Sequence, residues 1–165
     1  MQEGSARVAR GDGPSSIATG VAVLDHLLGQ LAATGGFEIG LEVAPDEPET
    51  EVGTAGATLG EALRPLLTRA GAARRGFGIT PAAEALALVV VEVSEQALVV
   101  SNADLTSTRA GGLRTDLAAA FLNDFAEAAG LTVHVRLMEG QDSQHVLEAI
   151  FKGLGVALAR ACDDA

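Results

Sequence analysis

The sequence contains no tryptophan and no tyrosine, and aromatic residues make up only 3% of its 165 residues. Hydrophobic residues nevertheless reach 48%, so the core has to be built mainly from Ala, Val and Leu. Side chains of this size allow helices and sheets to pack closely. A chain of this length suffices for one domain or for two small packed halves.

Cysteine is nearly absent as well. The single Cys162 cannot form a disulfide within the chain, which fits a reducing compartment. No apolar run reaches the roughly 18 residues needed to cross a bilayer, and no apolar signal segment is visible. We therefore expect a cytoplasmic protein with no membrane partner.

Positive charge is also scarce, with 11 Lys and Arg against 22 Asp and Glu and a net charge of −11. The basic residues are scattered, and Arg74 and Arg75 form the one adjacent pair. Nucleic-acid phosphates are bound by clustered Lys and Arg, so we expect no nucleic-acid partner. A small anionic ligand stays compatible with the sequence, because one local cation can bind a phosphate.

The spacing of apolar residues predicts alternating helices and strands. Helices are expected over 21–33, 55–71, 115–129 and 143–161, strands over 37–43, 84–93, 96–101 and 131–137 with a short one near 6–9, and a loop over the acidic, proline-containing segment 45–53. Asp142 or Ser143 is the predicted N-cap of the last helix, and Thr115 with Asp116 that of the helix before it. Strand 84–93 is apolar almost throughout, which is typical of a central strand.

Two segments of the chain share one pattern. Residues 27–43 (LLGQLAATGGFEIGLEV) and 121–137 (FLNDFAEAAGLTVHVRL) have apolar residues at the first, second and fifth positions, then Ala, a Gly stop and an alternating strand. This match predicts a single domain over 1–165 made of two pseudo-repeats, about 5–95 and 96–162, each running strand–strand–helix–strand–helix. The expected fold class is α/β, an α+β sandwich in which the sheets pack with the helices between or against them.

The chain has three histidines, His26, His134 and His145. His145 lies three residues before Glu148 in the last predicted helix, so the two side chains share a face. Neutral imidazole together with a carboxylate suits Mn, Fe or Zn. The alternative is an ordinary polar helix surface, with His145 at the helix start and Glu148 paired with Lys152.

Two more residues have both a functional and an ordinary interpretation. Asp25 precedes His26 and either orients its imidazole or is an exposed acid on a helix. Lys152 lies a further turn along the last helix and either binds an anionic group or is a solvated cation. The sequence has no nucleophile elbow, phosphate-binding glycine loop or dinucleotide fingerprint.

Three segments carry a resemblance to a known family: TGVAVLDHLLGQLAATGGFEIGLEV (19–43), GFGITPAAEALALVVVEVS (76–94) and LTVHVRLMEGQDSQHVLEAIFKGLGVALARA (131–161). They resemble imidazoleglycerol-phosphate dehydratase of histidine biosynthesis, in order, from about Gly11 to Ala161. The resemblance implies two duplicated halves with a fold like the second domain of ribosomal protein S5. It also implies trimers that assemble into a large symmetric shell. Two Mn(II) ions at subunit interfaces are expected to serve the dehydration of imidazole glycerol phosphate.

The resemblance implies metal ligands at His26, His134, His145 and Glu148. In the His-His-x-x-Glu motif of the second half, Gln144 stands at the position of the first histidine. An amide is a far poorer ligand than an imidazole.

In the first half, the two His positions of the same motif fall on Glu49 and Thr50, and the Glu position falls on Gly53. Half of the family's ligand set is therefore retained in this chain. Two Mn(II) ions need several imidazoles and carboxylates to offset desolvation and fix the geometry. Glu49 is an acid near a lost ligand position and a partial substitute for it.

The family's phosphate-binding cations are also reduced. Lys152 is retained, Gly76 stands at one arginine position with Arg75 beside it, and Gln96 stands at another. We therefore take Lys152, Arg75 and Gln96 as candidate substrate-binding residues.

The candidate catalytic residues are Glu148, Asp25 and Glu49. We expect a diverged member of the family with a degraded two-metal site, which binds one Mn(II) or Zn(II) per site or no metal. Such a protein would bind a small anionic metabolite and catalyse a different lyase or cyclase step. The alternatives are a catalytically inactive oligomeric subunit and a true imidazoleglycerol-phosphate dehydratase, which is a carbon–oxygen lyase.

Overall fold

The computed structural model describes residues 3–104, 109–110 and 113–165. The elements in chain order are β1 (Gly4–Arg10), β2 (Ser16–Ala18), α1 (Ala22–Gly35), β3 (Phe37–Val43), α2 (Pro48–Thr68), β4 (Arg75–Ala82), β5 (Ala85–Val93), β6 (Leu98–Ser101), β7 (Arg109–Ala110), β8 (Leu113–Arg114), α3 (Thr115–Ala129), β9 (Leu131–Glu139) and α4 (Ser143–Cys162).

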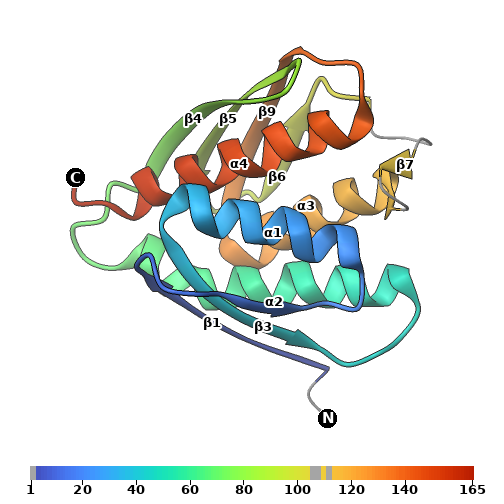
Figure 1. The fold of residues 1–165 in the computed structure, drawn as a ribbon. Helices are drawn as coiled ribbons and strands as arrows, with labels where there is room; N and C mark the ends of the chain where they lie inside the picture. Colours follow the sequence, from blue (N-terminus) through green and yellow to red (C-terminus); the bar gives the residue numbers. More distant parts are fainter. Residues whose placement is uncertain (1–2, 105–108, 111–112) are drawn as a thin grey trace.

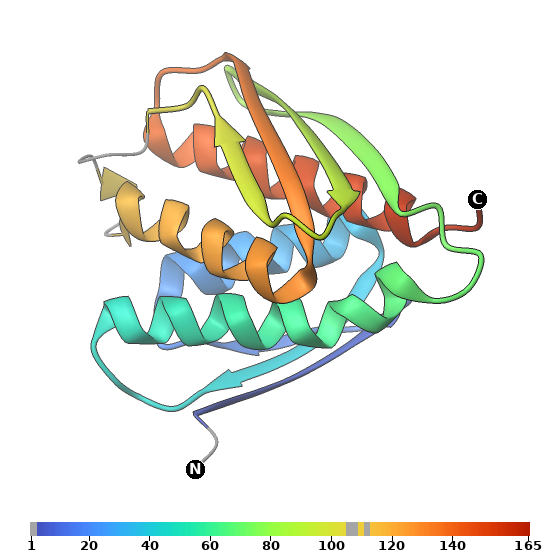
Figure 2. The same ribbon diagram turned by 180° about the vertical axis from the view of Figure 1, so that it is seen from behind.

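Two sheets enclose a layer of helices (Figure 1). The first sheet has the strand order β1-β3-β2, the second has the order β4-β5-β9-β6, and β7 pairs with β8. Helices α1 and α2 pack on the first sheet, whereas α3 and α4 pack on the second. The two layers meet where α1 packs on α4 and α2 on α3, and Figure 2 shows the second of these pairs. The predicted α+β sandwich with helices between the sheets is confirmed.

The strands β3 and β9 occupy equivalent places in their sheets. β3 pairs antiparallel with β1 and parallel with β2, and β9 pairs antiparallel with β5 and parallel with β6. The helices before them end at Gly36 and Gly130, whose φ angles of 69° and 73° lie in the left-handed region that favours glycine. The two predicted glycine stops are confirmed. β4 and β5 fall within the predicted first repeat, 5–95, but hydrogen-bond into the sheet of β9.

The predicted loop over 45–53 is wrong, because α2 already begins at Pro48. Proline suits the first position of a helix, where its missing N–H has no partner to lose. Val52 and the side chain of Glu51 are buried, so the acidic composition of this segment hid the start of an amphipathic helix.

Strand β4 is absent from the predicted elements. Its buried positions include Gly76 and Gly78, which weaken the alternating apolar signal of a strand. A Cβ atom on Gly78 would lie 2.6 Å from the carbonyl oxygen of Gly153, and one on Gly76 would overlap the carbonyl oxygen of Ala157. The glycines therefore let the backbone of α4 approach β4 closely.

The N-cap of α3 also differs from the prediction. Arg114 occupies the cap with extended backbone angles and caps no N–H with its side chain, whereas Thr115 and Asp116 lie inside the first turn. Arg114 instead forms an ion pair with Asp116, with 3.1 Å between guanidinium nitrogen and carboxylate oxygen.

The core is apolar, and three of its four phenylalanine side chains form a cluster. Phe121 has its ring centroid 5.9 Å from that of Phe125 and 5.7 Å from that of Phe151, and all three are fully buried. In the described part of the chain, no helix has both the length and the apolar character needed to cross a bilayer.

Candidate active site

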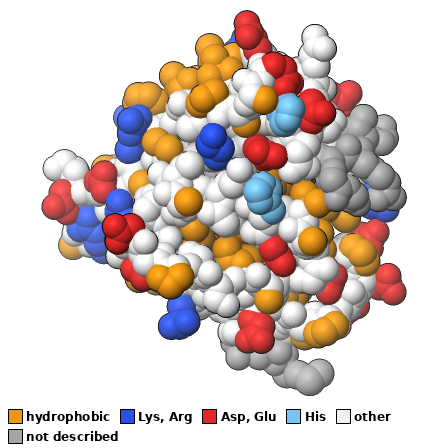
Figure 3. Space-filling view, in the orientation of Figure 1, with side chains coloured by type: hydrophobic (Ala, Val, Ile, Leu, Met, Phe, Trp, Pro, Cys, Tyr) orange, Lys and Arg blue, Asp and Glu red, His pale blue; other side chains and the backbone are white. Residues whose placement is uncertain are grey.

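Most of the predicted site residues lie on the face formed by α1 and α4. His26 is exposed on α1, and His145, Glu148 and Lys152 follow one another along α4. The space-filling view shows two histidine side chains on this face, with acidic side chains between and around them (Figure 3).

Asp142 fixes the start of α4, as predicted. Its backbone is extended, and its Oδ1 accepts hydrogen bonds from the backbone N–H groups of Gln144 (2.9 Å) and His145 (3.2 Å). These groups have no partner within the helix, so the carboxylate satisfies them. The cap places His145 in the first turn with a defined backbone direction.

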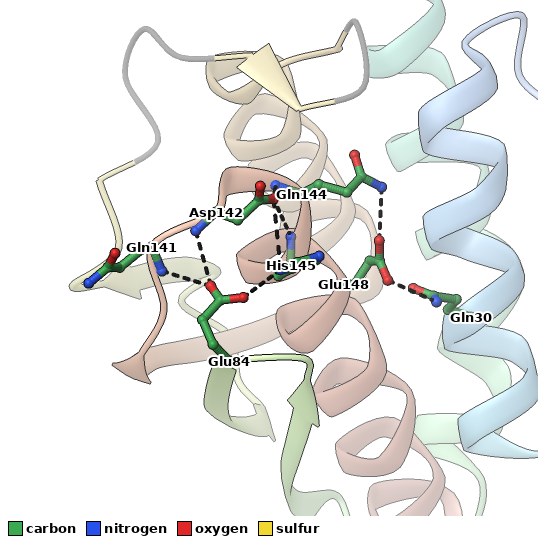
Figure 4. A network of polar contacts seen from close by, with 7 residues as sticks. All are labelled: Gln30, Glu84, Gln141, Asp142, Gln144, His145 and Glu148. Atoms are coloured by element: carbon green, nitrogen blue, oxygen red, sulfur yellow. Dashed lines mark hydrogen bonds and ion pairs between the residues drawn. The ribbon is translucent and has the colours of Figure 1, made fainter.

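Glu84 holds the ring of His145. Its Oε1 lies 2.5 Å from Nδ1 of His145, and its Oε2 accepts the backbone N–H groups of Gln141 (3.0 Å) and Asp142 (3.1 Å) (Figure 4). The two backbone hydrogen bonds, followed by that of His145, lower the pKa of Glu84 from 4.5 to about 2. The carboxylate is therefore ionised and accepts a hydrogen bond from Nδ1–H of His145. In the neutral ring the free lone pair is then on Nε2.

The same contact acts on the histidine. The hydrogen bond to Glu84 is the main cause that raises the pKa of His145 above its ordinary value of 6.5. Its side chain is 38% exposed, so solvent and small ligands reach the ring. A partly exposed imidazole with a fixed Nδ1 is suited to proton transfer near neutral pH.

Glu148 lies between two glutamine amides. Gln144 donates from Nε2 to Oε2 of Glu148 at 3.0 Å, and Gln30 donates from Nε2 to Oε1 at 3.4 Å (Figure 4). The Oε1 atoms of both glutamines are buried and accept no hydrogen bond from the described residues. The carboxylate is thus engaged by N–H donors on both oxygens.

Asp25 has a local role at the start of α1. Its Oδ1 accepts the backbone N–H of Thr19 at 2.9 Å and the hydroxyl of Thr19 at 2.5 Å. Thr19 is fully buried, so these bonds hold the segment that leads into the helix. His26 follows Asp25 and precedes Gln30 by one turn on the same face.

Lys152 and Glu49 both have protein partners. Nζ of Lys152 donates to the carbonyl oxygen of Pro81 at 2.8 Å. Glu49 lies 3.4 Å from the guanidinium of Arg114, so the acid at the family's first His position forms an ion pair between α2 and the N-cap residue of α3.

The remaining predicted residues lie away from the α1–α4 face. His134 is exposed on β9, on the side of the second sheet opposite to α4. Arg75 on β4 forms an ion pair with Glu92 on β5 at 2.8 Å. Gln96 is exposed between β5 and β6, where its carbonyl oxygen accepts the hydroxyl of Thr132.

Within the described residues of one chain, no three His, Cys, Asp or Glu side chains come close enough to hold a metal ion. Glu148 is bound by two amides, Nδ1 of His145 faces Glu84, and His134 is on another face. The donors of one chain therefore do not fit a Mn(II) or Zn(II) ion.

Sequence reasoning missed Glu84 and Gln30. Glu84 follows Ala83, whose φ of 51° marks the tight turn between β4 and β5, but nothing in the sequence indicates that this turn meets the start of α4. The spacing of His26 and Gln30, four residues apart on a helix, is the signal that could have identified the glutamine.

Comparison with protein families gives a match to the model described as imidazoleglycerol-phosphate dehydratase, over residues 19–158. Among curated proteins, the chain is 37% identical over 155 residues to the imidazoleglycerol-phosphate dehydratase of Methanocella arvoryzae, covering 92% of this chain and 80% of the relative. It is 34% identical over 157 residues to that of Clostridium botulinum, covering 93% of this chain and 80% of the relative.

Solved structures give the same result. The imidazoleglycerol-phosphate dehydratase of Staphylococcus aureus superposes with a TM-score of 0.90 at 29% identity, covering 99% of this chain and 95% of that one. The Pyrococcus furiosus enzyme superposes with a TM-score of 0.86 at 28% identity, covering 100% of this chain and 92% of that one.

Proposed function

Because the chain belongs to the imidazoleglycerol-phosphate dehydratase family, we propose that it removes water from imidazole glycerol phosphate as a carbon–oxygen lyase. The observation that carries this proposal is the identity of 34–37% with dehydratases over more than nine-tenths of the chain. The sequence favoured a different lyase step, and the comparisons support the dehydratase alternative better.

Dehydration requires a base that takes a proton from carbon and an acid that protonates the departing hydroxide, so that the C–O bond breaks and water leaves. His145 is the side chain whose geometry supports proton transfer, because Glu84 fixes Nδ1–H and leaves the lone pair on Nε2. The other candidate acids are engaged: Glu148 by two amides, Asp25 by Thr19.

Lys152 supports binding of the substrate phosphate. Its ammonium group lies one turn beyond Glu148 on α4 and is held by the carbonyl of Pro81, which accepts one of its three N–H donors. The remaining donors are available for a phosphate oxygen, and a charge-assisted bond of this kind is strong.

The test is direct turnover of imidazole glycerol phosphate, followed by mass spectrometry as the loss of one water, with and without added Mn(II). His145→Asn should lower the rate by about 10²-fold or more, the usual contribution of a general acid or base. Asn123→Ala, on the exposed surface of α3, is the matched control. Wild-type protein that forms no product under either metal condition would refute the proposal.

A second candidate function is binding without turnover, in an inactive subunit of the family. The specific observation in its favour is Gln144, whose amide stands where the family has a histidine and binds Glu148. Calorimetry with imidazole glycerol phosphate separates the two, because a binding protein gives a heat of association but no product.

We also infer that the chain self-associates, as a trimer or a larger symmetric shell, and that it is cytoplasmic. The family membership supports self-association. The chain has one cysteine and so forms no disulfide within itself, which supports a reducing compartment.

A further inference from the structure

Strand β1 forms an open edge of the first sheet. β3 pairs with β1 on one side and with β2 on the other, as β9 pairs with β5 and β6. In the second sheet, β5 is bordered in turn by β4. None of the strands in the described residues takes the corresponding place beside β1, which lies at the lower margin of the molecule in Figure 1. The first sheet therefore has room for one more strand on β1.

The hydrogen bonds at the two ends of β1 show which backbone groups face this edge. The carbonyl oxygen of Glu3 accepts the N–H of Ala44 at 2.8 Å, and the N–H of Gly11 donates to the carbonyl oxygen of Gly36 at 2.9 Å. In an antiparallel pair, the residues that bond the neighbouring strand alternate with those that do not. Along the register from Glu3 to Gly11, the backbone groups directed away from β3 belong to Gly4, Ala6, Val8 and Arg10.

β1 lacks the features that usually protect the edge of a sheet. Natural edge strands are short, contain proline or point a charge inward. The other edges of the two larger sheets fit this description, since β2 has three residues, β6 has four and β4 contains Pro81. β1 has seven residues without a proline, and the residues that it turns toward the helices, Gly4, Ala6 and Val8, carry no charge.

A groove of about 610 Å³ runs between this edge and helix α2. Its wall on α2 consists of small side chains and one acid, which recur every three or four residues along one face of the helix: Thr54, Ala57, Thr58, Glu61 and Ala62. On β1, Ala6 and Val8 pack on the core but are only half-buried. The equivalent place in the second sheet is filled, because β4 lies against α4 as well as beside β5. An added strand would therefore cover apolar surface in addition to bonding the edge.

The position of α2 decides what can occupy the groove. A second folded copy that paired edge to edge would bring its own α2, which packs on its own β1. Each α2 would then lie where the other copy's α2 already packs, so the two helices would overlap. A single extended segment without a helix layer of its own has no such conflict. Main-chain hydrogen bonds provide the affinity in this mode of recognition, and the sites for alternate side chains provide the specificity.

The charges of the groove add a preference for a basic segment. Glu3 and Glu61 are the charged side chains that line it, and both are exposed. A lysine or arginine beside either carboxylate gains a charge-assisted hydrogen bond, whereas an acid is repelled. Ala6 and Ala57 favour aliphatic side chains on the side that faces α2.

We propose that β1 and the groove beside it bind an extended, basic segment of another polypeptide, which pairs antiparallel with β1 as an added strand of the first sheet. The antiparallel direction follows from the equivalent pair, β4 and β5. The inference is independent of the proposed reaction, because strand addition needs neither substrate nor metal.

Titration of the full chain with a labelled peptide, followed by fluorescence anisotropy, tests the proposal. The probe is Thr-Val-Thr-Val-Lys-Val-Lys, whose valines would face α2 and whose lysines would lie toward Glu3 and Glu61. It should bind saturably with a dissociation constant below about 1 mM, and the peptide with glutamate in place of both lysines should bind at least about 2-fold more weakly. Glu61→Lys should reverse this preference, whereas Glu127→Lys, the same change on the exposed surface of α3, should not.

Ala6→Pro supplies a second variant. Proline removes an N–H that faces the open edge and leaves the bonds of Ser5 and Arg7 to β3 in place. The variant should stay folded by circular dichroism and bind the probe about 10-fold or more weakly, because a hydrogen bond is lost and the ring obstructs the added strand. Unchanged affinity in the folded variant would overturn the inference.

Hydrogen exchange read at single-residue resolution distinguishes strand addition from other modes of binding. In the chain alone, the N–H groups of Ala6 and Val8 should exchange quickly and those of Arg7 and Ala9 slowly, and the probe should slow the first pair. A lack of saturable binding, or protection that does not alternate along β1, would overturn the inference. Protection of Ala6 and Val8 in the chain alone would overturn it as well, and its dependence on protein concentration would identify a second copy as the occupant.

Discussion

The contact between α1 and α4 is tight enough that one methyl group should disturb it. Gly35 and Gly155 lie where the two helices cross, and a Cβ atom on Gly35 would lie 2.5 Å from the carbonyl oxygen of Gly155. A Cβ atom on Gly155 would overlap the carbonyl oxygen of Leu31 and lie 2.8 Å from the hydroxyl oxygen of Thr34. These neighbours include backbone, which cannot rotate away as a side chain can.

Gly155→Ala should therefore destabilise the protein although alanine is the better helix former. The helix propensity of alanine contributes about 1 kcal/mol in favour of the variant. Overpacking costs about 1–3 kcal/mol, and the upper end applies where the backbone has to move. The net loss is about 1–2 kcal/mol, which lowers Tm by roughly 2–8 °C in a chain of this size.

Gly29→Ala is the matched control within α1. A Cβ atom at Gly29 meets nothing within 4 Å, so the propensity gain of about 1 kcal/mol should appear undiminished and raise Tm by roughly 2–4 °C. Urea unfolding at one fixed protein concentration, followed by circular dichroism, measures both variants. If Gly155→Ala is as stable as Gly29→Ala, the close crossing of α1 and α4 is incorrect.

Three further changes test other parts of the structure. The pKa of Glu84 is lowered from 4.5 to about 2, so this carboxylate should contribute stability that is present above pH 4.5 and lost as the pH falls towards 2. The pKa of His145 is raised, so this imidazole should contribute stability that is present below pH 6.5 and lost as the pH rises through its pKa in the folded protein. Urea midpoints measured against pH should show both slopes, and Glu84→Gln should remove them. Phe121→Ala should cost about 3–5 kcal/mol in urea unfolding, because it empties the centre of the aromatic cluster, and a loss below 1 kcal/mol would contradict that packing. Gln144→His should raise the affinity for Zn(II) measured by calorimetry by about 10-fold or more, since an imidazole replaces an amide donor, whereas Asn123→His on α3 should not.

Residues next to the helix ends predicted where α1 and α3 end and where α4 begins. The glycine after α1 and the glycine after α3 end their helices because only glycine adopts the left-handed angle without cost, and Asp142 caps α4 because its side chain reaches the free N–H groups. These effects act over three or four residues, so the sequence alone contains them.

The missed features depend on contacts between distant segments. Gly76 and Gly78 weaken the apolar pattern of β4. Glycine is needed at these positions because the backbone of α4, which is distant in the sequence, packs closely against them. Glu84 binds His145 across 61 positions of sequence, and Gln30 binds Glu148 across 118. Spacing along the chain carries no information about such pairs. The site residues on α4 could therefore be predicted from the sequence, but their hydrogen-bond partners on other elements could not.

Gln144 decides which chemistry the α1–α4 face of one chain can perform. An imidazole at this position would offer a lone pair, whereas the amide donates N–H to Glu148, as Gln30 does from the other side. With both carboxylate oxygens engaged, the proton acceptors of this face are the imidazoles of His26 and His145, and Glu84 fixes the orientation of His145. Turnover of imidazole glycerol phosphate after treatment with EDTA should therefore persist if His145 transfers the proton directly. Activity that disappears with EDTA and returns only with Mn(II) would contradict this mechanism, because it would show that a metal ion takes part in the proton transfer.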